Sequence, residues 1–245
     1  ADGTIVRATA HCSYLQIYGD RVQDLLVPDP SKAPALQVRE APSNLGSKGA
    51  VFVRGLSEYQ VASAADVLAL VARGTKGRAT RATRSNEHSS RSHAVLQLAL
   101  EVESVEKGGN DDNNDPARWS QFAASDLPPS TAQTPGTAGM RTVVRRAKLS
   151  LVDLAGSEKW SDEVAASQQF ARELRAINTS LSALGNCIAA LADLATEAHR
   201  GGGHVPYRDS VLTRLLQDAL GGGTRAVVIA TASAAQDAYD ETAST

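Results

Sequence analysis

The chain has 245 residues, of which 42% are hydrophobic and 21% charged, so one domain with a sizeable core is expected. The formal charge of -2 argues against binding of nucleic acid or anionic membranes through overall charge. Two distant cysteines, Cys12 and Cys187, argue against a disulfide framework or a zinc site and predict reduced, packed thiols in a cytoplasmic protein.

Neither a membrane-spanning helix nor a signal peptide is predicted. No apolar stretch reaches the roughly 18 residues of a spanning helix, and the N-terminus lacks a basic-then-apolar layout. Since Met140 is the only methionine, the chain is expected to begin partway through a longer protein.

The first quarter of the chain predicts short strands joined by turns. Alternating apolar residues in 13–20 indicate a strand that ends at a Gly-Asp turn, and 22–26 predict a short helix or turn. Four prolines make 27–48 a loop region. Residues 51–56 then form a plausible edge strand.

A helix and two longer strands follow. Ser63 with Asp66 three residues later predicts the start of a helix over 63–74, which ends at a glycine. Residues 93–103 and 147–154 are predicted strands. The second is almost continuously apolar, which is typical of a central strand.

The remaining elements complete an α/β order without internal repeats. Residues 104–146 are polar and rich in Gly and Pro, so a disordered insertion is expected there. Helices are predicted over 167–199 and 209–220, followed by a buried strand over 226–233.

Two segments carry residues suited to phosphate chemistry. The serine-rich segment (residues 86–93, NEHSSRSH) has small hydroxyls that suit Mg²⁺ and phosphate oxygens, although a simple turn or helix cap is the alternative. In the strand-end segment (residues 153–158, DLAGSE), an apolar strand delivers Asp153 and then turns through Gly156. Such a carboxylate can hold Mg²⁺, while the alternative is an aspartate that merely ends a strand.

Together the two segments resemble the nucleotide-sensing switches of the kinesin motor domain. NEHSSRSH matches the kinesin pattern N-x-x-S-S-R-S-H, and DLAGSE matches the kinesin hexapeptide. Myosins share only part of these two motifs. The segments 13–26, 177–191 and 204–222 are also similar to kinesin segments, in the expected order. The C-terminal YDETAST is similar to the start of the family's last motor-domain helix.

The resemblance implies a P-loop NTPase-like kinesin motor fold. This is an α/β fold with a central, mostly parallel or mixed sheet and helices on both faces. Residues 1–245 would be one partial motor domain, incomplete at its N-terminal side, because no G-x-x-x-x-G-K-[ST] phosphate loop occurs in the chain. An incomplete sheet core and an exposed strand edge are therefore expected. The chain alone should not hydrolyse ATP.

The resemblance also implies roles for single residues. Ser89 and Ser90 would lie by the γ-phosphate and Mg²⁺, and Asp153 would hold the Mg²⁺ through water. Gly156 would sense the γ-phosphate. Arg91 and Glu158 would form a salt bridge that closes the two segments and helps to order the attacking water, and Asn86 would support the closed state. Arg78 matches an arginine of the family's N-R-x-T pattern, in which Gly77 replaces the Asn.

Microtubule binding would fall on the region 199–214, and the helix 178–198 would relay nucleotide state to it. The implied contact residues are Arg200, His204, Tyr207, Arg208 and Arg214. The sequence departs from the family at Val211, where a lysine is usual. The apolar residues Leu181, Leu184, Ile188 and Leu191 of the relay are expected to pack in the core.

Two functions stay open from the sequence. The first is part of a microtubule-stimulated ATPase motor that uses ATP and Mg²⁺ on the cytoskeleton, with tubulin as its partner. The alternative is a non-enzymatic, kinesin-derived module that binds microtubules or another partner. No nucleic-acid or membrane partner is expected, and the oligomeric state is not predicted.

Overall fold

The structure is a computed structural model that has two compact units, each described separately below. The residues described are 4–28, 33, 36–41, 50–85, 91–107, 140–156, 168–195, 203–221 and 224–231. Unit 1 comprises Ala1–Leu15, Asp24–Gly77 and Val95–Val152. Unit 2 comprises Gln16–Gln23, Arg78–Ala94 and Asp153–Thr245.

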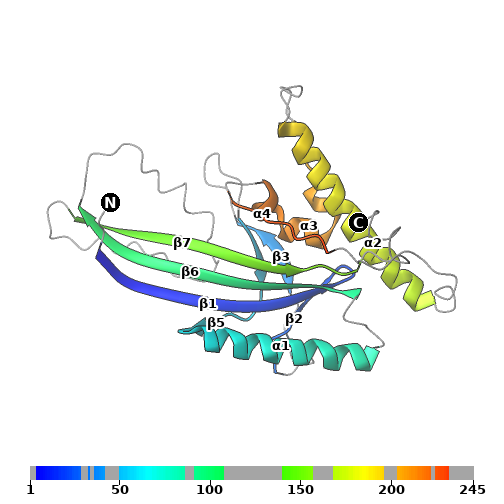
Figure 1. Ribbon diagram of the computed structural model, residues 1–245, viewed down its shortest axis with the longest axis horizontal. Coiled ribbons are helices and arrows are strands. Elements are labelled where there is room, and N and C mark those ends of the chain that lie inside the picture. Colours follow the sequence, from blue (N-terminus) through cyan, green and yellow to red (C-terminus); the bar gives the residue numbers. More distant parts are fainter. Residues whose placement is uncertain are drawn as a thin grey trace. The chain divides into compact units, whose positions relative to one another are not determined.

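Long strands form the main sheet, and each of the longest is drawn as a nearly continuous arrow (Figure 1). The sheet has the order β2-β1-β6-β7, and β5 pairs antiparallel with β1. A separate two-stranded antiparallel sheet joins β3 to β4. The bounds are β1 Thr4–Tyr18, β2 Arg21–Asp24, β3 Gln37–Glu40, β4 Val51–Arg54, β5 Tyr59–Val61, β6 His93–Lys107 and β7 Met140–Asp153.

The turn and the bend around β2 correct one prediction. Gly19 has a φ of 57° in the expected Gly-Asp turn. Residues 22–26, however, are not helical: β2 covers Arg21–Asp24 and a bend follows. The buried Asp24 carboxylate explains the bend, because it accepts hydrogen bonds from the backbone N–H of Leu26 and of Ser57, both at 2.8 Å.

The loop predicted over 27–48 contains β3, which was missed. The prolines on either side of Gln37–Glu40 signal a loop, yet the four residues between them are free to pair with β4. Residues 42–49 lie outside the described part of the chain. The edge strand predicted over 51–56 is confirmed as β4, which ends at Arg54.

Helix α1 (Ala64–Ser85) begins as predicted but continues eleven residues further than the glycine expected to end it. Ser63 and Asp66 cap its start reciprocally, since Ser63 Oγ accepts from Asp66 N and the Asp66 carboxylate accepts from Ser63 N. Gly74 lies within the helix, where a Cβ would overlap the ring of Tyr14. The glycine allows close packing within the helix.

Unit 1 has its core where α1 meets the sheet. Cys12, Val61 and Leu96 are buried together, and the α1 residues Val67, Leu70 and Val71 pack against them. Both cysteines are free and buried, as predicted.

Strand β7 lies at the end of the main sheet and not at its centre. Its side chains Leu149 and Leu151 are 55% and 54% exposed. The apolar run predicted a covered central strand, but no further strand of the described residues pairs beyond β7. Among the described strands β7 is therefore an edge strand, and the predicted central position is wrong there.

The disordered insertion was predicted over 104–146, but both ends of this range belong to strands. Strand β6 extends to Lys107, and β7 already begins at Met140. Within these extensions the Arg145 guanidinium donates to Ser104 Oγ at 3.0 Å, which holds the two strands together. Residues 108–139 lie outside the described part of the chain.

The helices of unit 2 match the predicted order, with one break. Helix α2 covers Gln168–Ala195, and the second predicted helix is divided at Leu216. Its parts are η6 (Tyr207–Asp209), α3 (Val211–Leu215) and α4 (Gln217–Gly221). No helix of the described residues is long and apolar enough to cross a membrane.

The buried face of α2 is not the predicted leucine face. The buried residues are Ile177, Ser180, Ala183 and Cys187. Of the four predicted core residues, Ile188 is exposed, and Leu181, Leu184 and Leu191 are half-buried. Apart from Ile177 these side chains are small, so they let neighbouring elements approach the helix backbone closely.

The buried strand predicted over 226–233 is absent in the described part of that range. Residues 224–231 form no regular element, and Val227, Val228 and Ile229 are each about 80% exposed (81%, 79% and 84%). An apolar run forms a buried strand only where other strands flank it, and no described strand pairs with this one.

Candidate functional site

Arg78 joins the two segments that the sequence singled out. Asp153 is the last residue of β7, and Ser92 directly precedes β6. From α1, Arg78 donates to Asp153 Oδ2 at 2.9 Å. It also donates to the Ser92 carbonyl oxygen at 2.7 Å and to Ser92 Oγ at 3.3 Å. The end of the serine-rich segment and the start of the strand-end segment therefore share one guanidinium.

This ion pair is buried on one side only. The Arg78 side chain is 13% exposed, whereas that of Asp153 is 71% exposed. Because one end faces solvent, the pair itself adds little stability. Its main effect is positional, since a nearly buried arginine with several acceptors holds the carboxylate at the strand end while leaving it accessible.

The accessible Asp153 carboxylate fits a role as a Mg²⁺ ligand or as an acceptor for water on the ion. Carboxylate oxygens suit Mg²⁺, which keeps several waters and takes few protein ligands in nucleotide sites. No group of three or more His, Cys, Asp or Glu side chains forms a metal site among the described residues. Any Mg²⁺ here would therefore need further ligands, such as hydroxyls or phosphate oxygens.

His93 lies beside this pair and is almost fully buried. Its Nδ1 accepts a hydrogen bond from the backbone N–H of Ala155 at 3.0 Å. Its Nε2 lies 2.8 Å from Ser180 Oγ on α2. Burial, and then the charge of Arg78, lower the pKa of His93 to about 4, partly opposed by Asp153. The ring is neutral at physiological pH.

The predicted nucleotide residues are only partly described. Gly156 is half-buried just after β7, and Arg91 is half-buried in the short turn before β6. Asn86, Ser89, Ser90 and Glu158 lie outside the described residues. The Arg91–Glu158 salt bridge therefore stays a prediction.

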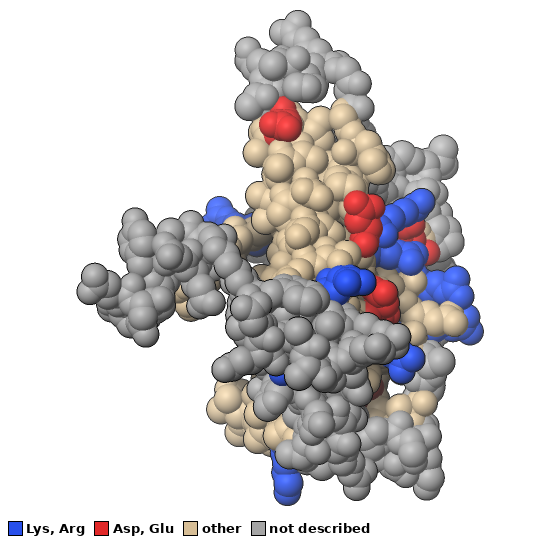
Figure 2. All heavy atoms as spheres, turned by 90° about the vertical axis from the view of Figure 1, so that its right-hand side faces the viewer, with Lys and Arg blue, Asp and Glu red and all other residues tan. Residues whose placement is uncertain are grey.

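The predicted microtubule contacts differ in exposure. His204 and Arg208 are exposed, Arg214 is half-buried, and Arg200 lies outside the described residues. Tyr207 is only 6% exposed, so it packs inside unit 2 and does not offer a surface contact. Figure 2 shows described basic side chains beside acidic ones on the face that it draws.

A capping box explains how this region is held. Ser210 Oγ accepts from Thr213 N at 3.0 Å, and Thr213 Oγ1 accepts from Ser210 N at 3.2 Å. Thr213 Oγ1 also donates to the Tyr207 carbonyl oxygen at 2.8 Å. The start of α3 is thereby fixed to η6, which positions the exposed Arg208.

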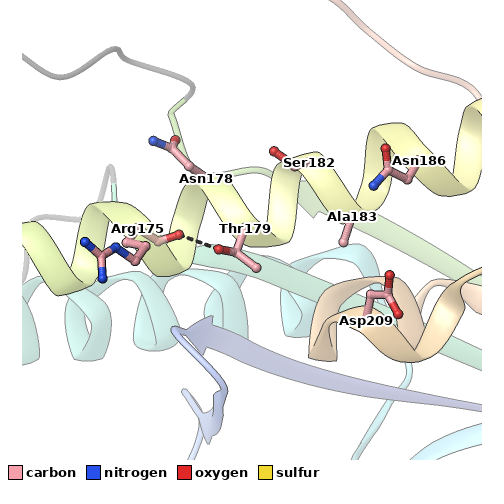
Figure 3. A pocket seen from close by; sticks show the side chains of 7 residues that line it. All are labelled: Arg175, Asn178, Thr179, Ser182, Ala183, Asn186 and Asp209. Atoms are coloured by element: carbon pink, nitrogen blue, oxygen red, sulfur yellow. Dashed lines mark hydrogen bonds between the residues drawn. The ribbon is translucent and has the colours of Figure 1, made fainter.

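A shallow pocket of about 480 Å³, lined mainly by polar residue types, lies along α2 (Figure 3). Helix α2 supplies most of its lining, and Asp209 faces it from η6. The lining residues are Arg175, Asn178, Thr179, Ser182, Ala183, Asn186 and Asp209. Thr179 donates to the Arg175 carbonyl oxygen at 2.8 Å, so its hydroxyl is used within the helix.

Sequence reasoning missed His93 and Ser180 as members of the site. His93 is the last residue of the serine-rich segment, and Ser180 lies in a helix beside Thr179 and Ser182, so no local signal sets it apart. Arg78 was singled out only by its motif, and its partners were not predicted. Only the folded chain brings these three residues, from α1, β6 and α2, to the end of β7.

The fold and the paired segments define a class, that of α/β proteins with P-loop NTPase-like architecture. Within this class the chain belongs to the kinesin motor domain family, because the family profile "Kinesin motor domain" matches residues 4–245. The kinesin motor fold expected from the sequence is confirmed.

Known relatives agree with this assignment. Kinesin-related protein 5 of Dictyostelium discoideum is 39% identical over 97% of this chain and 19% of its own length. Human kinesin-like protein KIF13B is 41% identical over 95% of this chain and 11% of its own length. A solved structure of a fast kinesin matches with a TM-score of 0.61 and 34% identity, over 92% of this chain and 49% of that one. The chain thus spans about half of the solved motor and a small part of the curated relatives.

Proposed function

We propose that the chain is part of a microtubule motor in which ATP hydrolysis, with Mg²⁺, is coupled to movement along the track. The observation that carries this proposal is the contact of Arg78 with both Asp153 and Ser92, because it joins the two segments that sense nucleotide in the family. A module that only binds a partner has no physical need for this arrangement.

The residues of the chain have separate roles in this proposal. Asp153 would hold Mg²⁺ through water, with Ser89 and Ser90 beside the ion and the γ-phosphate. Bound Mg²⁺ neutralises charge that develops on the phosphates during transfer. Arg78 keeps the Asp153 carboxylate at the strand end, and Gly156 leaves its backbone N–H unobstructed by a side chain.

Two further parts complete the proposal: the Arg91–Glu158 salt bridge, called the latch below, and the surface that would contact the microtubule. Arg91 and Glu158 would pair when the two segments close and would order the attacking water. The proposed microtubule contacts are Arg200, His204 and Arg208. Tyr207 would support this surface from inside, and Arg214 would lie at its edge. Arginine side chains facing an acidic microtubule surface would mainly increase the rate of encounter.

Asp153→Asn in the full-length protein tests the ion site. The neutral amide should weaken Mg²⁺-dependent ATP binding by about 10–100-fold, the range for a partner that acts through an outer-shell contact. Titration calorimetry with and without Mg²⁺ measures the effect. The matched control is Asp20→Asn in the exposed turn after β1. Equal affinities in the two variants would remove Asp153 from the site.

Glu158→Ala tests the latch separately. The variant should retain nucleotide binding and lose steady-state ATP turnover, because Arg91 without its partner cannot hold the closed state alone. A phosphate-release assay beside a binding assay distinguishes the two effects. Normal turnover in this variant would refute the role of Glu158.

A further inference from the structure

The hydrogen bonds through His93 run in one direction. Nδ1 accepts from Ala155 N–H, so in the neutral ring the proton must be on Nε2, which donates to Ser180 Oγ. The Ser180 hydroxyl then donates to the Ile177 carbonyl oxygen at 2.7 Å. Both ring nitrogens and the Ser180 hydroxyl therefore have hydrogen-bond partners of the correct kind.

A buried histidine with both nitrogens bonded can be simply a satisfied core residue. What sets His93 apart is where its partners lie: Ala155 belongs to the strand-end segment, and Ser180 to the middle of α2. The imidazole is rigid, so the positions of its two nitrogens are fixed relative to each other. Ala155 and Ser180 therefore cannot move apart without breaking a bond of 3.0 or 2.8 Å.

We propose that His93 is a positioning residue that couples the strand-end segment to α2 through Ser180. This inference deepens the proposed function and rests on it, because the strand-end segment is where nucleotide state would be sensed. A displacement of Ala155 would be passed to α2 through the ring.

Amide-resolved hydrogen exchange in the full-length protein, without nucleotide, tests the coupling. Ser180→Ala removes the acceptor for Nε2–H and should free the ring, so the Ala155 amide should exchange about tenfold faster, as expected for the loss of one net hydrogen bond. Ser182→Ala makes the same change at an exposed position of the same helix and should leave Ala155 unchanged. Equal exchange at Ala155 in both variants would overturn the proposal.

A second measurement applies even if Ser180→Ala fails to fold. The ¹⁵N shifts of the His93 ring in the unsubstituted protein report its tautomer, and the Nε2–H form is expected. A proton on Nδ1 would exclude the bond from Ala155 and overturn the coupling. Neither measurement needs ATP turnover, so a protein without ATPase activity would contradict the proposed function and leave this result standing.

In the working protein the same pair of variants should differ in nucleotide response. The ratio of microtubule affinities in the presence of an ATP analogue and of ADP measures the coupling between the two sites. Ser180→Ala should reduce this ratio several-fold, and Ser182→Ala should retain it. A full ratio in Ser180→Ala would show that the coupling runs elsewhere.

Discussion

At the scale of single residues, the pKa of His93 predicts how stability depends on pH. The pKa of the ring is about 4 in the folded chain, compared with 6.5 ordinarily. Between these values the unfolded chain binds more protons than the folded one, so stability falls as the pH falls. The contribution is fully present above pH 6.5, and between pH 7.5 and 5 about 2 kcal/mol of the free energy of unfolding should be lost.

Urea unfolding of the chain and of His93→Gln at the two pH values checks this prediction. Carboxylates titrate in both proteins, so the difference between them isolates the ring. The substituted chain should lose about 2 kcal/mol less on acidification. Identical losses would mean that His93 is not held neutral by its surroundings.

A single site residue could be predicted from the sequence only where a short local pattern marks it. Asp153 and Gly156 were found because an apolar strand followed by Asp-x-x-Gly is a local pattern. The partnership of Arg78 with Ser92 and Asp153 spans 75 residues of sequence at its longest. Such a contact follows only from the fold, which no local pattern encodes.

At the scale of elements, two helical glycines offer a matched comparison. Gly74 in α1 meets the Tyr14 ring, whereas nothing lies within 4 Å of the position a Cβ would take at Gly185 in α2. Gly74→Ala should destabilise the chain by about 1–3 kcal/mol through overpacking. Gly185→Ala should stabilise it by up to about 1 kcal/mol through helix propensity.

Thermal or urea unfolding of both variants measures the two effects. Stabilisation by Gly74→Ala would contradict the proposed role of Gly74, because it would show that close packing against Tyr14 does not require a glycine there. The same contact explains why the predicted helix end was wrong. The start of α1 is signalled locally by Ser63 and Asp66, whereas the reason for a glycine at position 74 is Tyr14, a partner distant in sequence.

At the scale of the whole molecule, the exposed apolar stretches predict association of the 245-residue chain on its own. Leu149 and Leu151 on β7 and residues 227–229 are largely exposed, and such stretches mark surfaces that other chain segments normally cover. The isolated chain should bind an apolar dye and self-associate. Leu151→Lys combined with Val228→Lys should reduce both.

Light scattering and dye fluorescence, with the full-length protein as reference, check this prediction. A monodisperse isolated chain that binds no dye would mean that these residues are covered in solution. The fold class itself was predictable, because the motifs and their order determine it. The exposure of β7 and of residues 226–231 was not predictable, because burial depends on flanking strands that local sequence does not reveal.

The most direct test of the motor assignment is steady-state ATP turnover by the full-length protein, with and without microtubules. Turnover that rises with microtubule concentration and disappears in Glu158→Ala is predicted. Microtubule binding without any turnover would contradict the assignment and identify a binding module that retains the kinesin fold.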